Sequence, residues 1–382
     1  FGELIGFCSA WGYWLCAVIA NVSYLVIVFS ALSFFTDTPE LRLFGDGNTW
    51  QSIVGASALL WIVHFLILRG VQTAASINLV ATLAKLLPLG LFVVLAMMMF
   101  KLDTFKLDFT GLALGVPVWE QVKNTMLITL WVFIGVEGAV VVSARARNKR
   151  DVGKATLLAV LSALGVYLLV TLLSLGVVAR PELAEIRNPS MAGLMVEMMG
   201  PWGEIIIAAG LIVSVCGAYL SWTIMAAEVP FLAATHKAFP RIFARQNAQA
   251  APSASLWLTN ICVQICLVLI WLTGSDYNTL LTIASEMILV PYFLVGAFLL
   301  KIATRPLHKA VGVGACIYGL WLLYASGPMH LLLSVVLYAP GLLVFLYARK
   351  THTHDNVLNR QEMVLIGMLL IASVPATWML VG

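Results

Sequence analysis

Charged side chains are confined to short segments that separate long apolar runs along the whole chain. Examples of runs without any charged residue are 4–36, 155–179, 205–227 and 310–348. A hydrocarbon core about 30 Å thick is crossed by roughly 20 apolar residues in a helix. The backbone of such a run meets no water there, so only helices or a closed barrel can span the bilayer. Because these runs are too long and too continuously apolar for barrel strands, they predict an all-α polytopic membrane protein.

The same pattern predicts eleven membrane-spanning helices. The ninth and tenth share one uncharged run, which Gly327-Pro328 divides because this dipeptide favours a turn. The expected spans are 9–34, 50–69, 76–100, 123–143, 155–179, 202–227, 254–274, 277–300, 308–325, 329–348 and 362–381.

Lysine and arginine are distributed unevenly between the segments that connect these spans. Fifteen of them lie in segments after even-numbered spans (the even joints), and six lie in segments after odd-numbered spans (the odd joints). Cytoplasmic segments are enriched in Lys and Arg, so we expect the even joints inside. This assignment places the start of the first span in the cytoplasm and the C-terminus outside.

The composition agrees with a membrane domain. The 382 residues are 61% hydrophobic and 10% charged, with a mean hydropathy of +0.97. A soluble domain is about 25% charged. We therefore expect one transmembrane domain over residues 1–382 rather than several soluble domains.

Neither the cysteines nor the paired histidines predict a metal site. All six cysteines lie in apolar runs without metal-ligand spacing, which is typical of small packing residues. His352 and His354 lie in a polar segment that offers no further ligands. We therefore expect no metal and no cofactor.

One basic residue, Lys85, lies in the middle of the third expected span. A charge at the centre of a membrane helix costs about 2.5–3.5 kcal/mol on insertion scales, so it is retained where it faces other helices or a cavity. We expect a functional role for Lys85. The alternative is that its amine reaches an interface or pairs inside the bundle.

Glu137 lies in the fourth expected span between Gly135 and Gly138. Glycine weakens a helix by about 1 kcal/mol relative to alanine, so the two glycines predict a break in this helix. A helix broken at the membrane midplane exposes backbone groups that bind the polar ends of ligands. The alternative is a close helix contact through the glycines, with Glu137 near the interface.

Three further ionisable residues lie within expected spans or, in the case of Glu228, at the inner end of one. Glu286 suits a cationic group or a proton if it faces a cavity, and the alternative is a buried structural hydrogen bond. Glu228 is expected to form a structural or gating pair with Lys237 or Arg241, which follow it in the chain. His64 is expected to be a hydrogen-bonded packing residue.

The sequence contains none of the common catalytic motifs. It lacks His-Glu-x-x-His, Gly-x-Ser-x-Gly, a P-loop and a paired-carboxylate motif. This argues against a primary pump or an intramembrane hydrolase, and we do not expect an enzyme.

Several segments together resemble one family. The segment 131–139, Trp-Val-Phe-Ile-Gly-Val-Glu-Gly-Ala, and the basic run 144–154 are similar to the sixth helix and following loop of the basic amino acid/polyamine antiporters. This family belongs to the amino acid–polyamine–cation superfamily, and its arginine–ornithine exchanger branch is the most similar. Four other segments resemble the loop entering the fifth helix, the eighth helix, the loop after it and the tenth helix: 68–78, 221–231, 239–247 and 290–292.

The resemblance implies an inverted repeat of two five-helix units followed by extra C-terminal helices. It places the remainder of the first repeat at 1–121, the second repeat at 122–302 and the C-terminal helices at 303–382. The broken helix is the sixth in the family but the fourth here, so we expect an N-terminally truncated chain without the first two helices. The family's Gly-Ser-Gly segment, which holds the substrate's carboxylate and amine, is expected to be absent with them.

The resemblance also implies a substrate site. Trp131 would stack on the substrate's side chain, an interaction of about 0.5–2 kcal/mol. Ile134 would pack on its aliphatic part, and the backbone near Gly135 would receive its polar end. The other pocket positions match Trp222 and four residues on the family's third helix, which are Tyr13, Cys16, Ala17 and Asn21.

The remaining matched positions concern gating and selectivity. Glu137 matches part of a gate below the site, and Tyr292 belongs to an inner gate. Ala284 stands where the family member best suited to arginine has a serine, which changes guanidinium recognition, and Glu286 is expected to compensate. Lys85 matches a lysine that occupies the ion site of sodium-coupled relatives, so an amine replaces the metal.

We therefore expect a multi-pass protein of the cytoplasmic (inner) membrane that exchanges cationic amino acids, arginine for ornithine, by alternating access. The alternative within transport is a proton-coupled symporter or exchanger of neutral amino acids, lysine/cadaverine or polyamines, with Lys85 as the proton carrier. A non-transporting membrane sensor is a further alternative, although no soluble extension for a partner supports it. The expected partners are small cationic amino acids and the lipid bilayer, without nucleic acid, and a homodimer is left open.

Overall fold

The computed structural model describes residues 1–70, 86–141, 149–186, 188–352 and 358–381. All of the elements in this part of the chain are helices, which confirms the all-α prediction. Their bounds in chain order are α1 Glu3–Thr36, α2 Trp50–Arg69, a helix over Leu86–Met99, α4 Leu102–Lys106, η1 Leu112–Leu114, α5 Val118–Phe133, α6 Gly138–Val141, α7 Lys149–Val177, α8 Arg180–Glu185, α9 Ser190–Met199, α10 Pro201–Thr235, η3 Arg241–Ala244, α11 Ser253–Thr273, α12 Tyr277–Ile302, α13 Pro306–Ser326, α14 Pro328–His352 and α15 Arg360–Val381.

Seven of the described helices are long and apolar enough to cross a membrane, namely α1, α2, α7, α10, α11, α12 and α13. The other expected spans contain helices where the structure describes them. The third is represented by Leu86–Met99, the fourth by α5 and α6, and the last two by α14 and α15. The predicted multi-pass membrane architecture is therefore confirmed.

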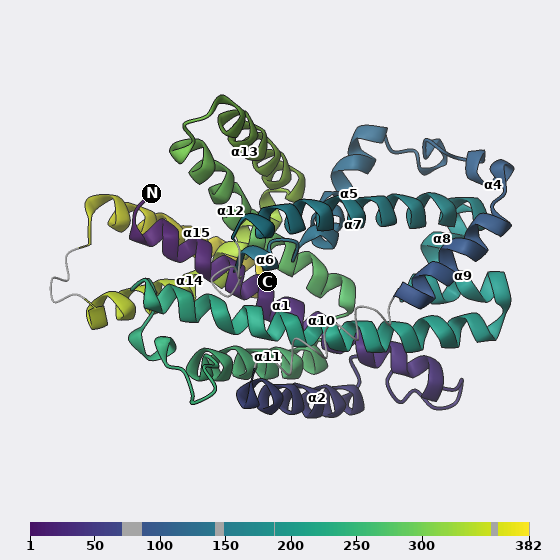
Figure 1. The fold of residues 1–382 in the computed structure, drawn as a ribbon, viewed down its shortest axis with the longest axis horizontal. Coiled ribbons are helices and arrows are strands. Elements are labelled where there is room, and N and C mark those ends of the chain that lie inside the picture. The colour runs from purple at the N-terminus through teal and green to yellow at the C-terminus, as the bar shows by residue number, and fades with distance from the viewer. Residues whose placement is uncertain (71–85, 142–148, 187, 353–357, 382) are drawn as a thin grey trace.

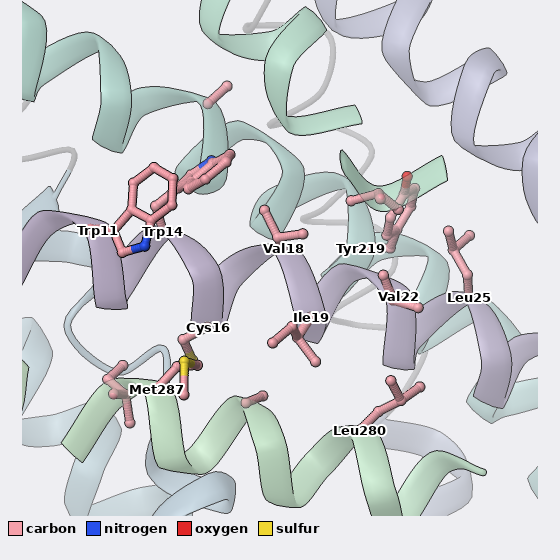
Figure 2. Close-up of a cluster of buried hydrophobic side chains, with 14 of the residues drawn as sticks. Trp11, Trp14, Cys16, Val18, Ile19, Val22, Leu25, Tyr219, Leu280 and Met287 are labelled. Carbon is pink, nitrogen blue, oxygen red and sulfur yellow. The ribbon is translucent and has the colours of Figure 1, made fainter. Parts of the chain in front are cut away.

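α1 is the central helix of the molecule. It packs against both α10 and α12, and α10 is followed outward by α11 and then α2 (Figure 1). Figure 2 shows Cys16 and Ile19 on the side of α1 that faces α12, while Tyr219 approaches from α10. Because buried residues occur on all sides of α1, this helix forms the core of the bundle.

An aromatic cluster holds the N-terminal part of α1. Phe7 packs against Phe239 and Phe345, with ring centroids 5.0 and 5.3 Å away. Trp11 Nε1 donates a hydrogen bond of 3.1 Å to the carbonyl oxygen of Leu337. These contacts attach α1 to α14 and to the segment that follows α10.

Gly12 allows α12 and α14 to approach α1 closely. Tyr338 Oη on α14 donates a hydrogen bond of 3.2 Å to the carbonyl oxygen of Met287 on α12. A Cβ atom at Gly12 would overlap Tyr338 Oη and lie 2.8 Å from that carbonyl oxygen. The absence of a side chain at residue 12 therefore permits the three helices to meet.

Polar contacts between connections agree with the predicted sidedness. Contacts among odd joints link Asn48 with Gly274, Asp108 with Arg180, and Asn188 with Asn278. Contacts at the opposite end link Leu68 with Asn247, Phe239 with His352, and Glu3 with Arg349. Each of these contacts joins two segments that the lysine and arginine count places on the same side of the membrane.

Candidate functional site

The fourth expected span is interrupted where the sequence predicts a break. α5 ends at Phe133, and α6 begins at Gly138. Between them Ile134 is extended, with φ −63° and ψ 130°, and Gly135 has φ +107°. A residue with a side chain is strained at this positive φ, whereas glycine adopts it readily. The break is therefore encoded locally by Gly135.

The Glu137 carboxylate accepts three hydrogen bonds from three elements. Tyr13 Oη on α1 donates to Oε1 at 2.9 Å, and Tyr292 Oη on α12 donates to Oε2 at 3.0 Å. The backbone N–H of Gly135 also donates to Oε2, at 3.0 Å. Hydrogen bonds to a charged group contribute about 1.5–3 kcal/mol each. The carboxylate thus ties α1 and α12 to the broken segment.

Aromatic rings surround the other side of the break. The ring centroid of Tyr24 lies 6.4 Å from that of Trp131 and 6.4 Å from that of Trp222. We call Tyr24, Trp131 and Trp222 the indole cluster, after the indole rings of its two tryptophans. A Cβ atom at Gly135 would lie 2.9 Å from Trp222 Cζ2, so the indole packs directly on the unwound backbone.

Small residues line the part of the cluster formed by α1 and α10. Ala17, Ala20 and Ala226 are completely buried and pack with Trp222 and Met225. Tyr13, Tyr24, Trp131 and Ile134 pack against this group. The structure therefore brings together most of the expected site: Tyr13, Ala17, Trp131, Ile134, Gly135, Glu137, Trp222 and Tyr292.

Tyr24 was not predicted from the sequence, although helical spacing contains the necessary signal. It follows Ala17 by seven residues and Asn21 by three, so all three lie on one face of α1. Met225 on α10 was also not predicted, although it follows Trp222 by three residues and so lies on the same face of the helix.

Asn21 adds an amide side chain to this face of α1. It is completely buried, and neither its amide nitrogen nor its amide oxygen has a hydrogen-bond partner among the described residues. An unpaired buried polar group costs about 1–3 kcal/mol. Such an amide is suited to bind a polar ligand.

The other expected site residues belong to the main core or to α12, or lie outside the described chain. Cys16 and Ala284 are completely buried in the main core, and Cys16 is directed toward Met287 of α12 (Figure 2). Glu286 is 4% exposed on α12. Lys85 lies outside the described residues.

The expected pairing of Glu228 with a following basic residue is wrong. Glu228 is buried on α10, whereas Lys237 and Arg241 are exposed and form no ion pair with any described residue. α10 ends at Thr235 and the chain turns at Lys237, where φ is +65°. This turn carries both basic side chains away from the helix.

His64 behaves as expected of a packing residue. Asn260 Nδ2 donates a hydrogen bond of 2.9 Å to His64 Nδ1, and the ring of Trp257 lies 4.3 Å from the imidazole centroid. This contact joins α2 to α11. It contributes to the scaffold on the outer side of α10.

The described part of the chain contains no group of three or more His, Cys, Asp or Glu side chains that could hold a metal ion. His352 Nε2 lies 2.9 Å from the carbonyl oxygen of Phe239, and His354 lies outside the described residues. The six cysteines are free thiols.

Comparison with known proteins places the chain among transporters. The sequence model of the amino acid permease family matches residues 1–370. The chain is 44% identical over 369 residues to an arginine/ornithine antiporter of Pseudomonas aeruginosa, covering 91% of this chain and 75% of that protein. It is 39% identical over 396 residues to an arginine/agmatine antiporter of Chlamydia pneumoniae, with coverages of 98% and 81%. It is 38% identical over 392 residues to a putative amino-acid transporter of Clostridium perfringens, with coverages of 97% and 81%.

Proposed function

Because the chain belongs to the amino acid permease family, we propose that it is an antiporter exchanging cationic amino acids, arginine for ornithine, across the cytoplasmic membrane. One structural observation carries this proposal. The unwound backbone at Gly135 faces the rings of the indole cluster and leads to the Glu137 carboxylate, which two tyrosines hold. The names of the relatives from Pseudomonas and Chlamydia support arginine as one of the exchanged substrates.

The indole cluster suits the side chain of a cationic substrate. A guanidinium or ammonium group over an indole face is stabilised by about 0.5–2 kcal/mol, and the larger values apply to desolvated sites. Ala17 and Ala20 leave room for the aliphatic part of the substrate. The buried amide of Asn21 supplies a donor and an acceptor for its polar groups.

Glu137 forms the gate in this proposal. The predicted orientation places it nearer the cytoplasm than Trp131, because the fourth span runs inward. Its hydrogen bonds to Tyr13 and Tyr292 join α1 and α12 across the path from the indole cluster. Alternating access would break these bonds when the site opens inward and restore them when it closes.

Charge selectivity involves Glu286 in this proposal. The side chain is buried on α12, the helix that also carries the gate residue Tyr292. A buried acid favours a cation over a neutral amino acid of the same size. Ala284, without a hydroxyl group, would leave recognition of the cationic group to other residues.

The test is a counterflow experiment with the protein expressed from its complete reading frame. Liposomes loaded with ornithine are expected to take up labelled arginine, and empty liposomes are not. Trp131→Leu is expected to abolish this uptake. The matched control is Trp271→Leu, because Trp271 is 52% exposed on α11 and lies outside the site.

Two results would contradict the proposal. One is equal uptake by empty and loaded liposomes under an imposed pH gradient, which indicates symport. The other is unchanged exchange in the Trp131→Leu variant, which would remove the indole cluster from the substrate site.

A further inference from the structure

An open cavity of about 480 Å³ lies between the segment that follows α10 and the predicted cytoplasmic end of α14, separate from the proposed exchange site. The α10–α11 connection, which includes η3, forms one wall, and the last turns of α14 form the other. Its lining includes Arg241, Ile242, Arg245, Tyr347 and Thr351. The cavity therefore combines two guanidinium groups, two hydroxyl groups and an apolar residue.

The two arginines of this cavity have no counter-ion within the described part of the chain. Arg241 and Arg245 are exposed, and neither forms an ion pair with a described residue. The segment 229–275 contains no aspartate or glutamate. By contrast, Arg349 at the end of α14 pairs with Glu362 at 2.5 Å. The cavity therefore carries two positive charges without a described counter-ion, and an external anion would neutralise them.

Contacts on both sides of the cavity hold the α10–α11 connection in position. Phe239, just before Arg241, is completely buried and packs against Phe7. Beyond Arg245, Asn247 Nδ2 donates a hydrogen bond of 2.8 Å to the carbonyl oxygen of Leu68. The backbone that carries the arginines is therefore fixed before a ligand binds, which reduces the entropic cost of binding.

An apolar stripe leads from the cavity along the outer surface of α14. Leu343, Tyr347 and Thr351 are four residues apart, so they share one face of the helix. Leu343 is 71% exposed and Tyr347 is 59% exposed. Because Tyr347 belongs to both the stripe and the cavity wall, one ligand can contact the guanidinium groups and the apolar surface together. A soluble anion would use only the donors.

We propose that this cavity binds the phosphate headgroup of an anionic phospholipid of the inner leaflet. The guanidinium groups of Arg241 and Arg245 match phosphate oxygens, with which arginine forms bidentate hydrogen bonds. The acyl chains lie along the stripe that starts at Tyr347. Basic pockets between membrane helices on the cytoplasmic side recognise anionic headgroups in this way, and the lysine and arginine count places this end in the cytoplasm.

The test measures lipid binding rather than transport, so it does not depend on the proposed exchange. The protein is placed in nanodiscs of phosphatidylcholine with increasing phosphatidylglycerol, and the retained lipid is counted by native mass spectrometry. The R241Q/R245Q variant is expected to bind phosphatidylglycerol about thirty-fold more weakly, from the contribution of two arginines near the membrane surface. The control variant R305Q/K309Q removes two exposed basic residues from another even joint and is expected to bind normally.

Further arms distinguish a lipid site from a soluble-anion site and from general surface charge. Inorganic phosphate in pure phosphatidylcholine nanodiscs is expected to leave the unfolding temperature unchanged, and a shift equal to that from phosphatidylglycerol would overturn the lipid assignment. Equal weakening in R305Q/K309Q would overturn it in favour of general surface charge. Should R241Q/R245Q fail to fold, L343S tests the stripe, and unchanged phosphatidylglycerol retention in L343S would contradict the proposal.

Discussion

α1 and α7 are almost equally apolar but differ strongly in burial. In the most apolar 18-residue stretch of α1 the mean hydropathy is 2.3 and 78% of the residues are buried, whereas in that of α7 the mean hydropathy is 2.4 and none of the residues is buried. Hydropathy therefore predicts that both helices lie in a membrane, and it does not distinguish a core helix from a peripheral one. Between helices in lipid, close packing rather than the hydrophobic effect drives association. The difference must lie in the shape of each helix surface.

Small residues on α1 explain its central position. Gly12 lies at the contact of α1 with α14 and α12, and Ala17 lies at its contact with α10. α7 instead presents large leucines, of which Leu161 and Leu168 are 56% and 53% exposed. A Cβ atom added at Gly165 on α7 would have no described neighbour within 4 Å, so the missing side chain there serves no described contact.

Adding one methyl group to each helix gives the largest expected contrast. Gly12→Ala is expected to lower the free energy of unfolding by about 3 kcal/mol, because the methyl overlaps Tyr338 and approaches the Met287 carbonyl. Gly165→Ala is expected to raise it by up to about 1 kcal/mol through helix propensity. Thermal unfolding in one detergent measures both, and equal effects would show that α1 packs no more tightly than α7.

Removing side-chain volume gives the next largest contrast. Leu25 on α1 is completely buried, so Leu25→Ala is expected to lower the free energy of unfolding by about 2 kcal/mol. This is the lower end of the range found for buried leucines in soluble proteins, because a leucine that leaves its packing in a membrane meets lipid and not water. Leu161→Ala is expected to stay within about 0.5 kcal/mol. The same unfolding assay measures both, and a larger loss for Leu161→Ala would reverse the assignment of core and periphery.

A tyrosine on each helix also touches the broken span, which permits a matched hydroxyl deletion. Tyr13 on α1 donates to the Glu137 carboxylate, and Tyr167 on α7 donates to the carbonyl oxygen of Val132 at 2.8 Å. Tyr13→Phe is expected to cost about 1.5 kcal/mol and to increase arginine efflux without a counter-substrate, because it removes a bond to a charged gate. Tyr167→Phe is expected to cost about 0.5 kcal/mol and to leave efflux unchanged. Equal efflux in both variants would argue against a gating role for Tyr13.

The smallest expected effect concerns Asp37, which ends α1 outside the expected membrane region. Partial burial opposes ionisation, but the backbone N–H groups of Phe44 and Gly45 outweigh it and hold the pKa of Asp37 below its usual 3.8. Because the folded-state pKa is lowered, this stabilisation is present above pH about 4 and is lost as the pH falls further. Asp37→Asn is expected to reduce the acid sensitivity of unfolding between about pH 5 and pH 3, and an unchanged pH profile would contradict this account.

The local features of the fold were predictable from the sequence, and the long-range ones were not. The second span was predicted at the residues where α2 lies, and the break at Gly135 followed from two glycines around an acid. Both depend only on residues close together in the chain. The contact of Tyr13 with Glu137 joins residues far apart in sequence, and only the resemblance assigned both to the region of one site.

The central position of α1 also could not be predicted from apolar character. It depends on which helices meet the small residues of α1, a property of the assembled bundle. The wrong pairing of Glu228 has a similar origin, since the turn at Lys237 redirects the basic side chains after α10 has ended. Short-range charge patterns could not reveal this change of direction.

The three hydrogen bonds on Glu137 have a consequence for leakage. Oε1 is held by α1, and Oε2 is held by α12 and the broken segment, so withdrawal of either helix alone leaves a carboxylate oxygen short of a donor in a medium of low dielectric constant. When both helices leave together, water that enters the opened path replaces the tyrosine donors, so a partly separated arrangement that loses a donor while it still excludes water is the higher in energy. Under the proposed exchange, one carboxylate thus makes the two helices move as a pair, and it shortens the lifetime of half-open states through which solute could pass uncoupled.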